Sequence, residues 1–572
     1  MTEVASDALL AGLDPEQREV ALATRGAVCV LAGAGTGKTR AITHRIAYAA
    51  AIGVVDPAHV LALTFTVRAA GEMRGRLRQL GAARVRASTF HAAALRQLNY
   101  FWPRVIGGRP PRLIDAKAAL VREAAKDARV RLDGPGLADA ASEIEWAKTT
   151  QLRPDAYARA AAAAGRTPVI GAEAMAFVYD GYERLRRERH LIDFESVLEL
   201  TAAIVLEHRG AADQVRDTFR YFVVDEYQDV NPLQKLLLDA WLGDRDELCV
   251  VGDPDQVIYS FTGATPAYLT GFTAEFPGAA LVRLVRDYRS TPQVVAVANQ
   301  LMRSGQALIA QQPAGPQPVL TQYSDDASEA AGVAVQIRSL IAAGVPAGQI
   351  AVLVRINADT ERFERVLTEA KVPYVVRGTE RFYERPVVRQ ALVLFRGAAR
   401  GEAASPADPD PLPAAVRHVL SGIGFTAGAP AGGSAARERW ESLAAIAELA
   451  DDLYAARPHA SLGDFAAELT ERAELGHAPA VQGVTLASMH AAKGLEWDAV
   501  LLPGLVEGLM PIVHAKTPEA VDEERRLLYV AVTRARQHLY LSWSPARTPA
   551  GQGRVAARQR SRFLDDLRLG RR

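Results

Sequence analysis

The segment from Ala32 to Thr39, Ala-Gly-Ala-Gly-Thr-Gly-Lys-Thr, constrains the fold more than any other part of the sequence. It follows the apolar run Ala27–Leu31, which predicts a buried strand, and it precedes a helical pattern. A glycine-rich turn between a strand and a helix lets successive backbone N–H groups surround a phosphate, and the helix N-terminus adds positive potential. We therefore interpret the segment as a P-loop; the alternative is a glycine-rich turn that ends in Lys-Thr by chance.

The P-loop interpretation gives each residue of the segment a role. Lys38 would reach the β- and γ-phosphates of a nucleotide, and the hydroxyl of Thr39 would bind Mg²⁺. Four residues would surround the phosphates with their backbone, namely Ala34, Gly35, Thr36 and Gly37. The usual pattern begins with glycine, so Ala32 fits only if its φ is not forced to be positive.

An acidic pair, Asp225-Glu226, follows the apolar run Tyr221–Val224. It would lie at the carboxyl end of a strand, where a parallel sheet presents its ligands. Asp225 would hold Mg²⁺ through water, and Glu226 would orient and deprotonate the attacking water. An acidic pair after a strand is usually a solvated loop or a helix start, but the P-loop favours the catalytic interpretation.

Short apolar runs alternate with helical patterns in two regions of the chain. The candidate strands of the first region are Ala27–Leu31, Val60–Thr64, Tyr221–Val224 and Leu248–Val251, and those of the second are Ile350–Arg355, Val484–Ser488, Ala499–Leu502 and His538–Trp543. This alternation predicts an α/β fold in which parallel sheets are covered by helices on both faces.

Two mainly helical stretches interrupt these regions. Between Leu95 and His208 strand signals are absent, and three segments have apolar residues at helical spacing: Ala116–Ala128, Ala140–Lys148 and Ala172–His190. After Arg400, the segments Gly401–Pro413 and Thr426–Ser434 have the small-residue composition of linkers. A helical pattern then resumes over Ala435–Leu475.

Composition excludes several classes of protein. Of the 572 residues 49% are hydrophobic and 23% charged, as in globular proteins, and no window approaches the ~18 apolar residues of a membrane helix. The N-terminus lacks the basic start of a signal peptide, and two cysteines, Cys29 and Cys249, exclude a disulfide framework. A net charge of +1 argues against a uniformly basic surface but says nothing about local patches. We expect a cytoplasmic, multidomain protein.

Together with the P-loop, Asp225-Glu226-Tyr227-Gln228-Asp229 resembles the UvrD/Rep/PcrA group of superfamily 1 DNA helicases. Other segments resemble further motifs of this family, in the family's order: Leu13–Gln17, Leu63–Thr66 with Ala69-Ala70, Thr89–His91, Asp193-Phe194, Val251–Gln256 with Ile258–Phe261, Asp287–Ser290, His490–Trp497 and Glu523–Ala535. One such motif is weak, but their number and order are specific. The sequence is most similar to a short UvrD-like branch, without the C-terminal cysteine cluster and HRDC domain that some of its members carry.

The resemblance implies two RecA-like P-loop NTPase domains, 1A and 2A, each interrupted by a mainly helical insertion, 1B or 2B, with ATP bound in the cleft between 1A and 2A. The implied boundaries are 1–96 and 206–280 for 1A, 97–205 for 1B, 281–398 and 480–572 for 2A, and 399–479 for a shortened 2B.

The resemblance also implies nucleotide contacts outside the P-loop. Gln17 would hydrogen-bond the adenine edge, Tyr288 would stack on the base, and Arg40 would flank the base or a phosphate. Gln256 would sense the γ-phosphate, and Glu496 would contact the nucleotide from 2A.

Two arginines are implied at the γ-phosphate, Arg289 and Arg534. A fixed guanidinium stabilises the charge that develops on the phosphoryl oxygens and is worth about 10³–10⁵ in kcat. Arg536 is the alternative to Arg534, which we prefer because it precedes the alanine of Thr-Arg-Ala.

Single-stranded DNA would cross the tops of 1A and 2A. Phe65, Tyr259 and Phe261 are the candidates for base stacking, worth roughly 1–3 kcal/mol per base, with core packing as the alternative for each. Thr64, through its backbone, and the two histidines His91 and His490 are further candidate DNA contacts.

The implied activity is that of an ATP-dependent 3′→5′ DNA helicase or translocase in DNA repair or replication. It would use ATP and Mg²⁺, act on single-stranded DNA and 3′-tailed junctions, and have repair proteins as partners, without membrane association. Departures from the family pattern include Thr262 in place of an arginine and a hairpin, Trp543–Gly551, with no aromatic near its tip. They favour one alternative, a translocase that displaces proteins but unwinds duplex poorly; the other is a DNA-binding scaffold with a vestigial ATPase.

Overall fold

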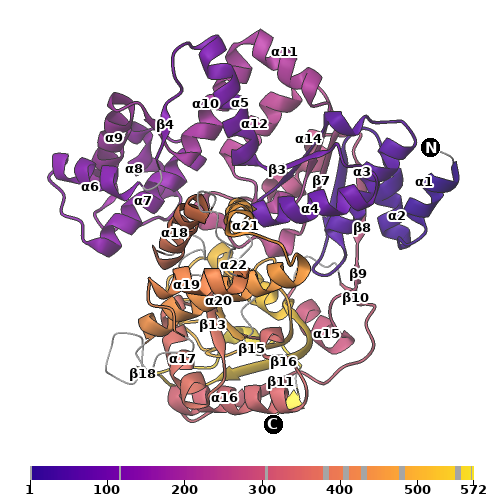
Figure 1. Ribbon diagram of the computed structural model, residues 1–572. Coiled ribbons are helices and arrows are strands. Elements are labelled where there is room, and N and C mark those ends of the chain that lie inside the picture. The colour runs from indigo at the N-terminus through magenta and orange to yellow at the C-terminus, as the bar shows by residue number, and fades with distance from the viewer. Residues whose placement is uncertain are drawn as a thin grey trace. The chain divides into compact units, whose positions relative to one another are not determined.

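The computed structural model describes residues 3–114, 117–302, 307–377, 386–402, 411–426, 434–475, 483–547, 556–568 and 570–571. The chain forms two compact units (Figure 1). Unit 1 consists of Met1–Arg289 and Met302–Gln311, and unit 2 consists of Ser290–Leu301 and Gln312–Arg572. Within the described ranges no helix combines the length and the apolar character needed to cross a membrane.

Unit 1 contains a parallel sheet of six strands in the order β3-β2-β6-β7-β1-β8. The strands are β1 (Val28–Ala32), β2 (Val60–Thr64), β3 (Arg86–Thr89), β6 (Tyr221–Val224), β7 (Leu248–Gly252) and β8 (Ala280–Leu284). The four candidate strands of the first region are confirmed as β1, β2, β6 and β7. The outermost strands, β3 and β8, were not predicted.

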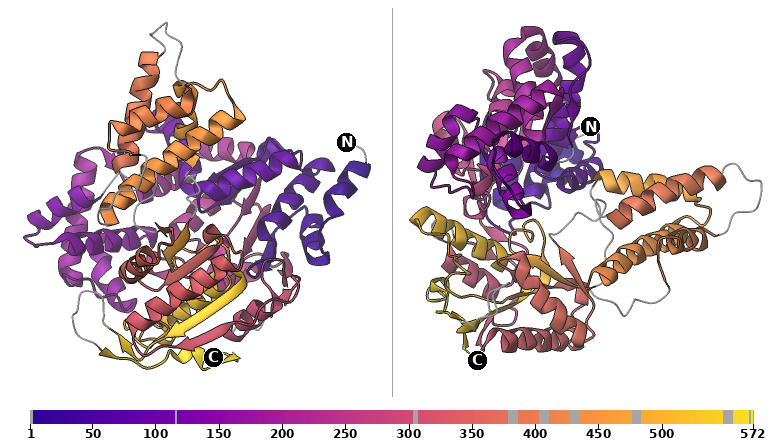
Figure 2. Two further views of the ribbon diagram at one scale, coloured as in Figure 1. Left: turned by 60° about the horizontal axis from the view of Figure 1, so that its bottom comes forward. Right: turned by 90° about the vertical axis from the view of Figure 1, so that its left-hand side faces the viewer.

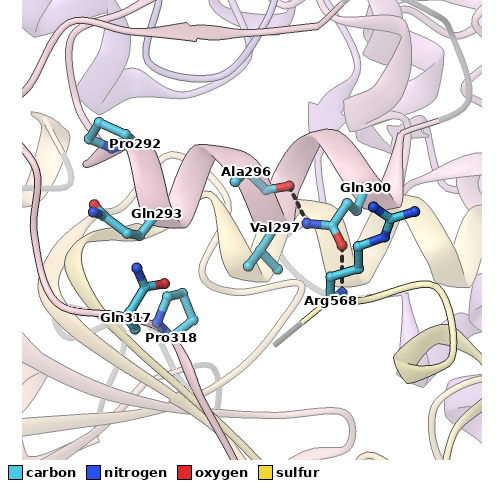
Figure 3. Close-up of a pocket in the computed structure, with 8 residues that line it drawn as sticks. All are labelled: Pro292, Gln293, Ala296, Val297, Gln300, Gln317, Pro318 and Arg568. Atoms are coloured by element: carbon cyan, nitrogen blue, oxygen red, sulfur yellow. Dashed lines mark hydrogen bonds between the residues drawn. The ribbon is translucent and has the colours of Figure 1, made fainter. Parts of the chain in front are cut away.

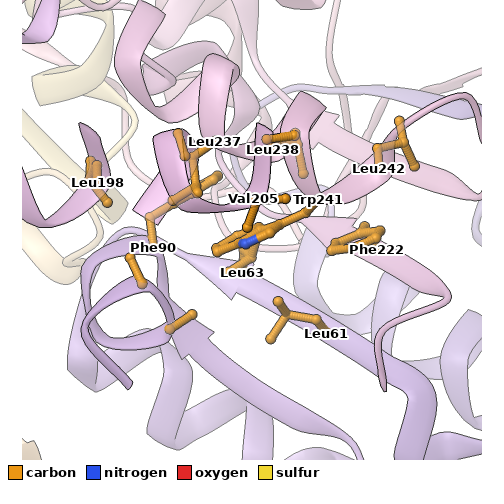
Figure 4. Close-up of a cluster of buried hydrophobic side chains, with 14 of the residues drawn as sticks. Leu61, Leu63, Phe90, Leu198, Val205, Phe222, Leu237, Leu238, Trp241 and Leu242 are labelled. Carbon is orange, nitrogen blue, oxygen red and sulfur yellow. The ribbon is translucent and has the colours of Figure 1, made fainter. Parts of the chain in front are cut away.

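Alternate strand residues of this sheet enter two different cores. On one face Leu61, Leu63 and Phe222 pack against α5 (Phe90–Val105), α10 (Phe194–Glu207), α11 (Arg209–Thr218) and α12 (Pro232–Leu242). On the other face the sheet packs against α2 (Pro15–Leu22), α3 (Lys38–Ala51) and α4 (Val67–Gln79). Figure 4 shows the centre of the first core, where the Trp241 ring stacks 6.3 Å from Phe90 and 6.3 Å from Phe222.

The helical interruption of unit 1 has a core of its own. Its helices are α6 (Ala118–Asp127), α7 (Gly134–Thr149), α8 (Pro154–Ala163) and α9 (Ala172–Glu188), which pack around Val121, Ile144, Tyr157 and Tyr182. The three predicted helices are confirmed as α6, α7 and α9. The predicted absence of strands is wrong in one detail, because β4 (Arg112–Leu113) and β5 (Leu191–Ile192) form a short parallel pair.

Unit 2 contains a second sheet, of seven strands in the order β13-β14-β12-β15-β16-β11-β19. The strands are β11 (Val319–Gln322), β12 (Ile350–Val354), β13 (Tyr374–Arg377), β14 (Val484–Ser488), β15 (Trp497–Leu502), β16 (Ala535–Trp543) and β19 (Gly570–Arg571), and every pairing is parallel. The helices of this unit include α15 (Pro292–Leu301), α16 (Asp326–Ala342), α17 (Thr360–Glu369) and α22 (Pro518–Val532). The candidate strands of the second region are confirmed as β12, β14, β15 and β16.

The second interruption forms a cluster of four helices, α18 (Pro386–Glu402), α19 (Leu412–Ser421), α20 (Ser434–Ala456) and α21 (Leu462–Leu475), which lie side by side in both views of Figure 2. Their core includes Phe395 and Phe465, whose ring centroids are 5.4 Å apart. The insertion therefore begins with α18, earlier than the predicted boundary at residue 399. Of the two predicted linkers, 403–410 and 427–433 lie outside the described residues.

The division between the units also differs from the predicted boundary at residue 280. Strand β8 pairs with β1 along its whole length, from Val28 opposite Ala280 to Ala32 opposite Leu284. Residues 281–289 consequently lie in unit 1 and not with the second sheet. The remaining elements are short: α1 (Glu3–Leu10), α13 (Ala267–Thr270), α14 (Phe272–Glu275), β9 (Arg286–Asp287), β10 (Ile309–Ala310), β17 (Ala546–Arg547) and β18 (Ala556–Ala557).

Candidate nucleotide site and nucleic-acid surface

The P-loop connects β1, which ends at Ala32, to α3, which begins at Lys38. Gly35 and Gly37 have φ values of 70° and 77°, in the left-handed region that side chains disfavour. A Cβ on Gly35 would meet the Asp287 carboxylate at 2.5 Å, so both backbone angle and space require glycine there. Ala32 belongs to the strand and is not among the residues with positive φ, so alanine is accommodated at the first position of the motif.

Gln17 is held against the P-loop. Its side chain is 2% exposed, and its Nε2 donates to the carbonyl of Thr36 at 3.0 Å. The Asp14 carboxylate caps α2 by accepting from the Gln17 backbone N–H at 2.7 Å. Because an amide nitrogen carries two hydrogens, the bond to Thr36 leaves the second one for another acceptor.

Tyr288 and Arg40 also lie beside this loop. The backbone N–H of Tyr288 donates to the carbonyl of Gly35 at 2.9 Å, and its hydroxyl donates to Asp14 at 2.7 Å. Partial burial and the bond to Asp14 raise the pKa of Tyr288 to about 12, while the residue stays 40% exposed. Arg40 donates to the carbonyl of Gly12 at 2.6 Å. Gln17, Arg40 and Tyr288, which are far apart in sequence, therefore surround one loop.

The acidic pair faces the end of the P-loop. Lys38 Nζ lies 3.9 Å from Glu226 Oε2 and 4.0 Å from Asp253 Oδ2, and the hydroxyl of Thr39 donates to Asp225 at 3.3 Å. Lys38 therefore lies within 4.0 Å of two carboxylates, and its positive charge also acts on a third, that of Asp225. Burial, and then the charge of Glu226, raise the pKa of Asp225 to about 7, and burial also raises the pKa of Asp253.

This group of oxygens fits Mg²⁺. A hard dication prefers hydroxyl and carboxylate ligands, and its charge would favour the ionised form of Asp225, which burial and then the charge of Glu226 disfavour. Thr39 and Asp225 are the residues that would hold it. No cluster of three or more His, Cys, Asp or Glu residues arranged as metal ligands occurs in the part of the chain that the structure describes.

Glu226 has an unusual backbone conformation, with φ 53° and ψ 41°. A non-glycine residue in this region is strained, and such strain is common where a side chain must be held in one place. Gln228 completes the arrangement: its Nε2 donates to Glu226 at 2.5 Å, and its Oε1 accepts from the backbone N–H of Asp253 at 3.0 Å. Gln256 in turn donates to Asp253 at 2.7 Å. Asp253 and Gln228 lie in predicted motifs, but neither was predicted to have a role of its own.

The remaining predicted nucleotide contacts belong to a short segment of unit 1 and to unit 2. In unit 1, the Arg289 backbone N–H donates to Asp287, which is 1% exposed. In unit 2, the Arg534 guanidinium is buried and donates to the carbonyls of Val530 at 2.9 Å and Leu495 at 3.2 Å. Glu496 pairs with Arg536 at 2.6 Å. The two alternatives at this position thus differ, since Arg536 forms a carboxylate pair and Arg534 bonds backbone carbonyls.

The candidate DNA contacts of unit 1 follow strands β2 and β3. Phe65 is half-buried and its ring lies 6.3 Å from that of Phe90, so it is partly a core residue. Burial lowers the pKa of His91 to about 4, which makes this side chain neutral at physiological pH. The ring of Phe194, 5.8 Å from His91, is 48% exposed and was not among the predicted contacts. Its position directly after Asp193 in a predicted motif was the available signal.

Two more candidates lie on the segment Tyr259–Gly263, which we call the aromatic loop. The rings of Tyr259 and Phe261 meet edge to face at 6.0 Å. Phe261 is 48% exposed, whereas Tyr259 is half-buried, and this burial raises the pKa of Tyr259 to about 12. Stacking on a base therefore suits Phe261 better than Tyr259. In unit 2, burial lowers the pKa of His490 to about 4.

A cavity of about 240 Å³ lies in unit 2 between α15 and the C-terminal segment (Figure 3). Pro292, Val297 and Pro318 give it an apolar side, and the backbone N–H of Arg568 donates to Gln300 at 2.6 Å across its rim. None of the predicted site residues lines it.

Comparison with known proteins finds similarity to DNA helicases along nearly the whole chain. The model of the UvrD/REP helicase N-terminal domain matches residues 13–277, and that of the UvrD-like helicase C-terminal domain matches residues 282–404 and 418–546. ATP-dependent DNA helicase UvrD2 of Mycobacterium tuberculosis is 51% identical over 588 residues, covering 99% of this chain and 83% of that protein. ATP-dependent DNA helicase UvrD1 of the same species is 29% identical, covering 98% and 86%. ATP-dependent DNA helicase PcrA of Staphylococcus epidermidis is 27% identical, covering 98% and 87%.

Proposed function

This chain belongs to the UvrD/REP helicase family, and we propose that it is an ATP-dependent DNA helicase that translocates 3′→5′ along single-stranded DNA in repair or replication. The observation that carries the proposal is the arrangement at the P-loop, where Lys38 lies within 4.0 Å of Glu226 and Asp253. Such a site can bind the phosphates of ATP and place a carboxylate beside them that can act as a general base. We also propose a cytoplasmic location, as predicted, because the DNA on which such a helicase would act lies there.

In this proposal, different residues of unit 1 have different roles in ATP hydrolysis. The P-loop backbone and Lys38 bind the phosphates, and Glu226 accepts a proton from the attacking water while its strained backbone and Gln228 fix its direction. Gln256 is held by Asp253 and responds to the γ-phosphate. Thr39 and Asp225 would hold Mg²⁺, which would supply positive charge beside the phosphate oxygens.

The roles of Arg289, Arg534, Tyr288 and Glu496 in this proposal rest on the motifs. A guanidinium beside the γ-phosphate stabilises the charge of the transition state, so loss of Arg534 should lower kcat more than nucleotide affinity. The guanidinium of Arg534 must first release the carbonyls of Val530 and Leu495. Arg536 lies in a carboxylate pair and is the less suitable donor.

The test of the proposal is ATP hydrolysis with and without single-stranded DNA. Wild type should be strongly stimulated, and Glu226→Gln should lose about 10²–10⁴ in kcat because it lacks the general base, while it still binds a fluorescent ATP analogue. Glu207→Gln, an exposed glutamate on α10, is the matched control and should behave as wild type. An ATPase rate that DNA leaves unchanged would reject the translocase, and an unaffected Glu226→Gln variant would reject the assigned base.

A translocase that displaces proteins but unwinds poorly is the second candidate. It is favoured by Thr262, which supplies no cation at the aromatic loop, and by the compact second insertion, α18 to α21. Displacement of a bound protein and separation of a tailed duplex, measured at equal ATPase rates, distinguish the two. Hydrolysis stimulated by DNA would exclude the third candidate, a scaffold with a vestigial ATPase.

A further inference from the structure

The aromatic loop is held by the insertion between β4 and β5 and not only by its own strand. The hydroxyl of Thr149, at the C-terminal end of α7, lies 2.9 Å from the carbonyl of Thr262 and 3.0 Å from that of Trp146. Gly263 has φ 92°, and a Cβ there would meet Thr150 at 3.0 Å and Thr149 at 3.1 Å. The end of α7 and the end of the loop are therefore packed in direct contact.

Arg166 makes a second contact from the same insertion. One arm of its guanidinium donates to the carbonyl of Phe261 at 3.2 Å, and its other nitrogens bind Glu143 at 2.8–3.1 Å. The guanidinium also lies 4.5 Å from the Trp146 ring, and Tyr157 donates to Glu143 at 2.5 Å. Glu143 and Trp146 thus fix the arginine before it reaches the loop, and Tyr157 fixes Glu143, so Arg166 can act as a rigid support.

The end of α7 is itself fixed to the helix that carries Phe194. Lys148, with a side chain only 3% exposed, binds Asp193 at 2.9 Å, Glu183 at 3.0 Å and Ser196 at 2.7 Å. Asp193 precedes Phe194 and caps α10 through the N–H of Ser196 at 2.8 Å. One helix end therefore sets the positions of two half-exposed aromatic rings, Phe194 and Phe261.

We propose that Thr149 and Arg166 are positioning residues for DNA binding: they hold the aromatic loop so that Phe261 meets a base at a fixed distance from Phe194. This inference rests on the proposed function, because it requires that the rings stack on single-stranded DNA. Thr262 carries no charge to support the neighbouring rings, and a guanidinium bound to the loop backbone supplies that support from another element.

The two adjacent threonines of α7 provide a matched test. Thr149→Val removes the hydroxyl that lies 2.9 Å from the carbonyl of Thr262, and Thr150→Val removes one that bonds Trp146 and Ala147 of its own helix. The methyl group of Thr150 that faces Gly263 is retained in valine. Arg166→Leu has its own control in Arg184→Leu, whose arginine pairs with Asp127 on the surface of the same insertion.

The measurement is the dependence of the ATPase rate on the concentration of oligo-dT, with oligo-dT affinity by anisotropy. Thr149→Val and Arg166→Leu should each raise the half-saturating oligo-dT concentration about three- to tenfold, the effect of one lost hydrogen bond. The basal rate and the rate at saturating oligo-dT should stay within about twofold of wild type, and both controls should match wild type. Thr149→Ser, which keeps the hydroxyl, should restore the affinity.

Two results would overturn the inference while leaving the proposed function intact. One is an equal effect of Thr149→Val and Thr150→Val, which would indicate a general effect on α7. The other is a loss of the saturated rate with an unchanged half-saturating concentration. A wild-type protein whose ATPase does not respond to oligo-dT would instead reject the proposed function, and this inference with it.

Discussion

At the scale of single residues, the candidate nucleotide site depends on a few backbone conformations, and only some of them can be predicted from the sequence. The glycines and the lysine of the P-loop could be predicted because their order is specific. The role of Gln228 could not, because its bond to Glu226 depends on how the chain is folded after β6, where Glu226 has φ 53°. A glutamate does not indicate a left-handed backbone conformation, because glycine or asparagine is the usual residue there. Asp253 was missed for a similar reason, since only the fold brings it to 4.0 Å from Lys38.

The steric role of Gly35 can be separated from its backbone angle. Gly35 and Gly53 have φ values of 70° and 75°, but only at Gly35 would a Cβ meet another group within 4 Å. Gly53→Ala should therefore cost only the strain of the left-handed conformation, about 1–2 kcal/mol of unfolding free energy. Gly35→Ala should cost more and should abolish binding of an ATP analogue, because Asp287 must move. Calorimetric titration with the analogue checks this, and equal affinities in the two variants would contradict it.

The partly buried His91 predicts a dependence of stability on pH. Its pKa is about 4 in the folded protein and 6.5 ordinarily, so the unfolded state binds more protons between these values. Stability should then fall as pH falls from about 6.5 towards 4. His91→Gln should remove about 1–2 kcal/mol of the loss between pH 7 and 5, measured by urea unfolding. His514→Gln, at an exposed position, is the control, and a variant as acid-sensitive as wild type would exclude the burial of His91.

At the scale of elements, buried strands could be predicted and edge strands could not. The predicted strands β2, β12 and β14 are buried throughout, and their sequences are mainly apolar, with only threonine and serine among the other residues. Strand β8 lies at the sheet edge, and three of its five residues are exposed, including Arg283. Strand β3, at the other edge, begins with the exposed Arg86. Edge positions tolerate charge, which removes the apolar pattern on which the prediction relied.

The end of α7 also gives a prediction about stability. Lys148→Met should destabilise the protein by about 3–5 kcal/mol, because it removes the cation that binds the buried carboxylate of Asp193 at 2.9 Å. Adding Asp193→Asn should recover part of the loss, because asparagine carries no charge and still caps α10. Thermal unfolding of the two single variants and the double variant forms the cycle. Strictly additive effects would show that the two groups do not interact.

At the scale of the whole molecule, the chain consists of two units with parallel sheets, each interrupted by a helical cluster with its own core. The sequence predicted this organisation from the alternation of strands and helices. It could not predict that β8 belongs to the first sheet, because the pairing of β8 with β1 is a contact between segments far apart in the sequence. The near-neutral charge of +1 is a sum over the whole chain and conceals the acidic group at the P-loop.

The most direct test of the central claim is strand separation on two duplexes that differ only in carrying a 3′ or a 5′ single-stranded tail, with excess trapping strand. We predict ATP-dependent separation of the 3′-tailed duplex in preference to the 5′-tailed one. Lys38→Ala, which lacks the phosphate-binding ammonium, should show none. Preference for the 5′ tail, or separation that persists without ATP or in Lys38→Ala, would contradict the claim that this protein is a 3′→5′ helicase driven by ATP hydrolysis.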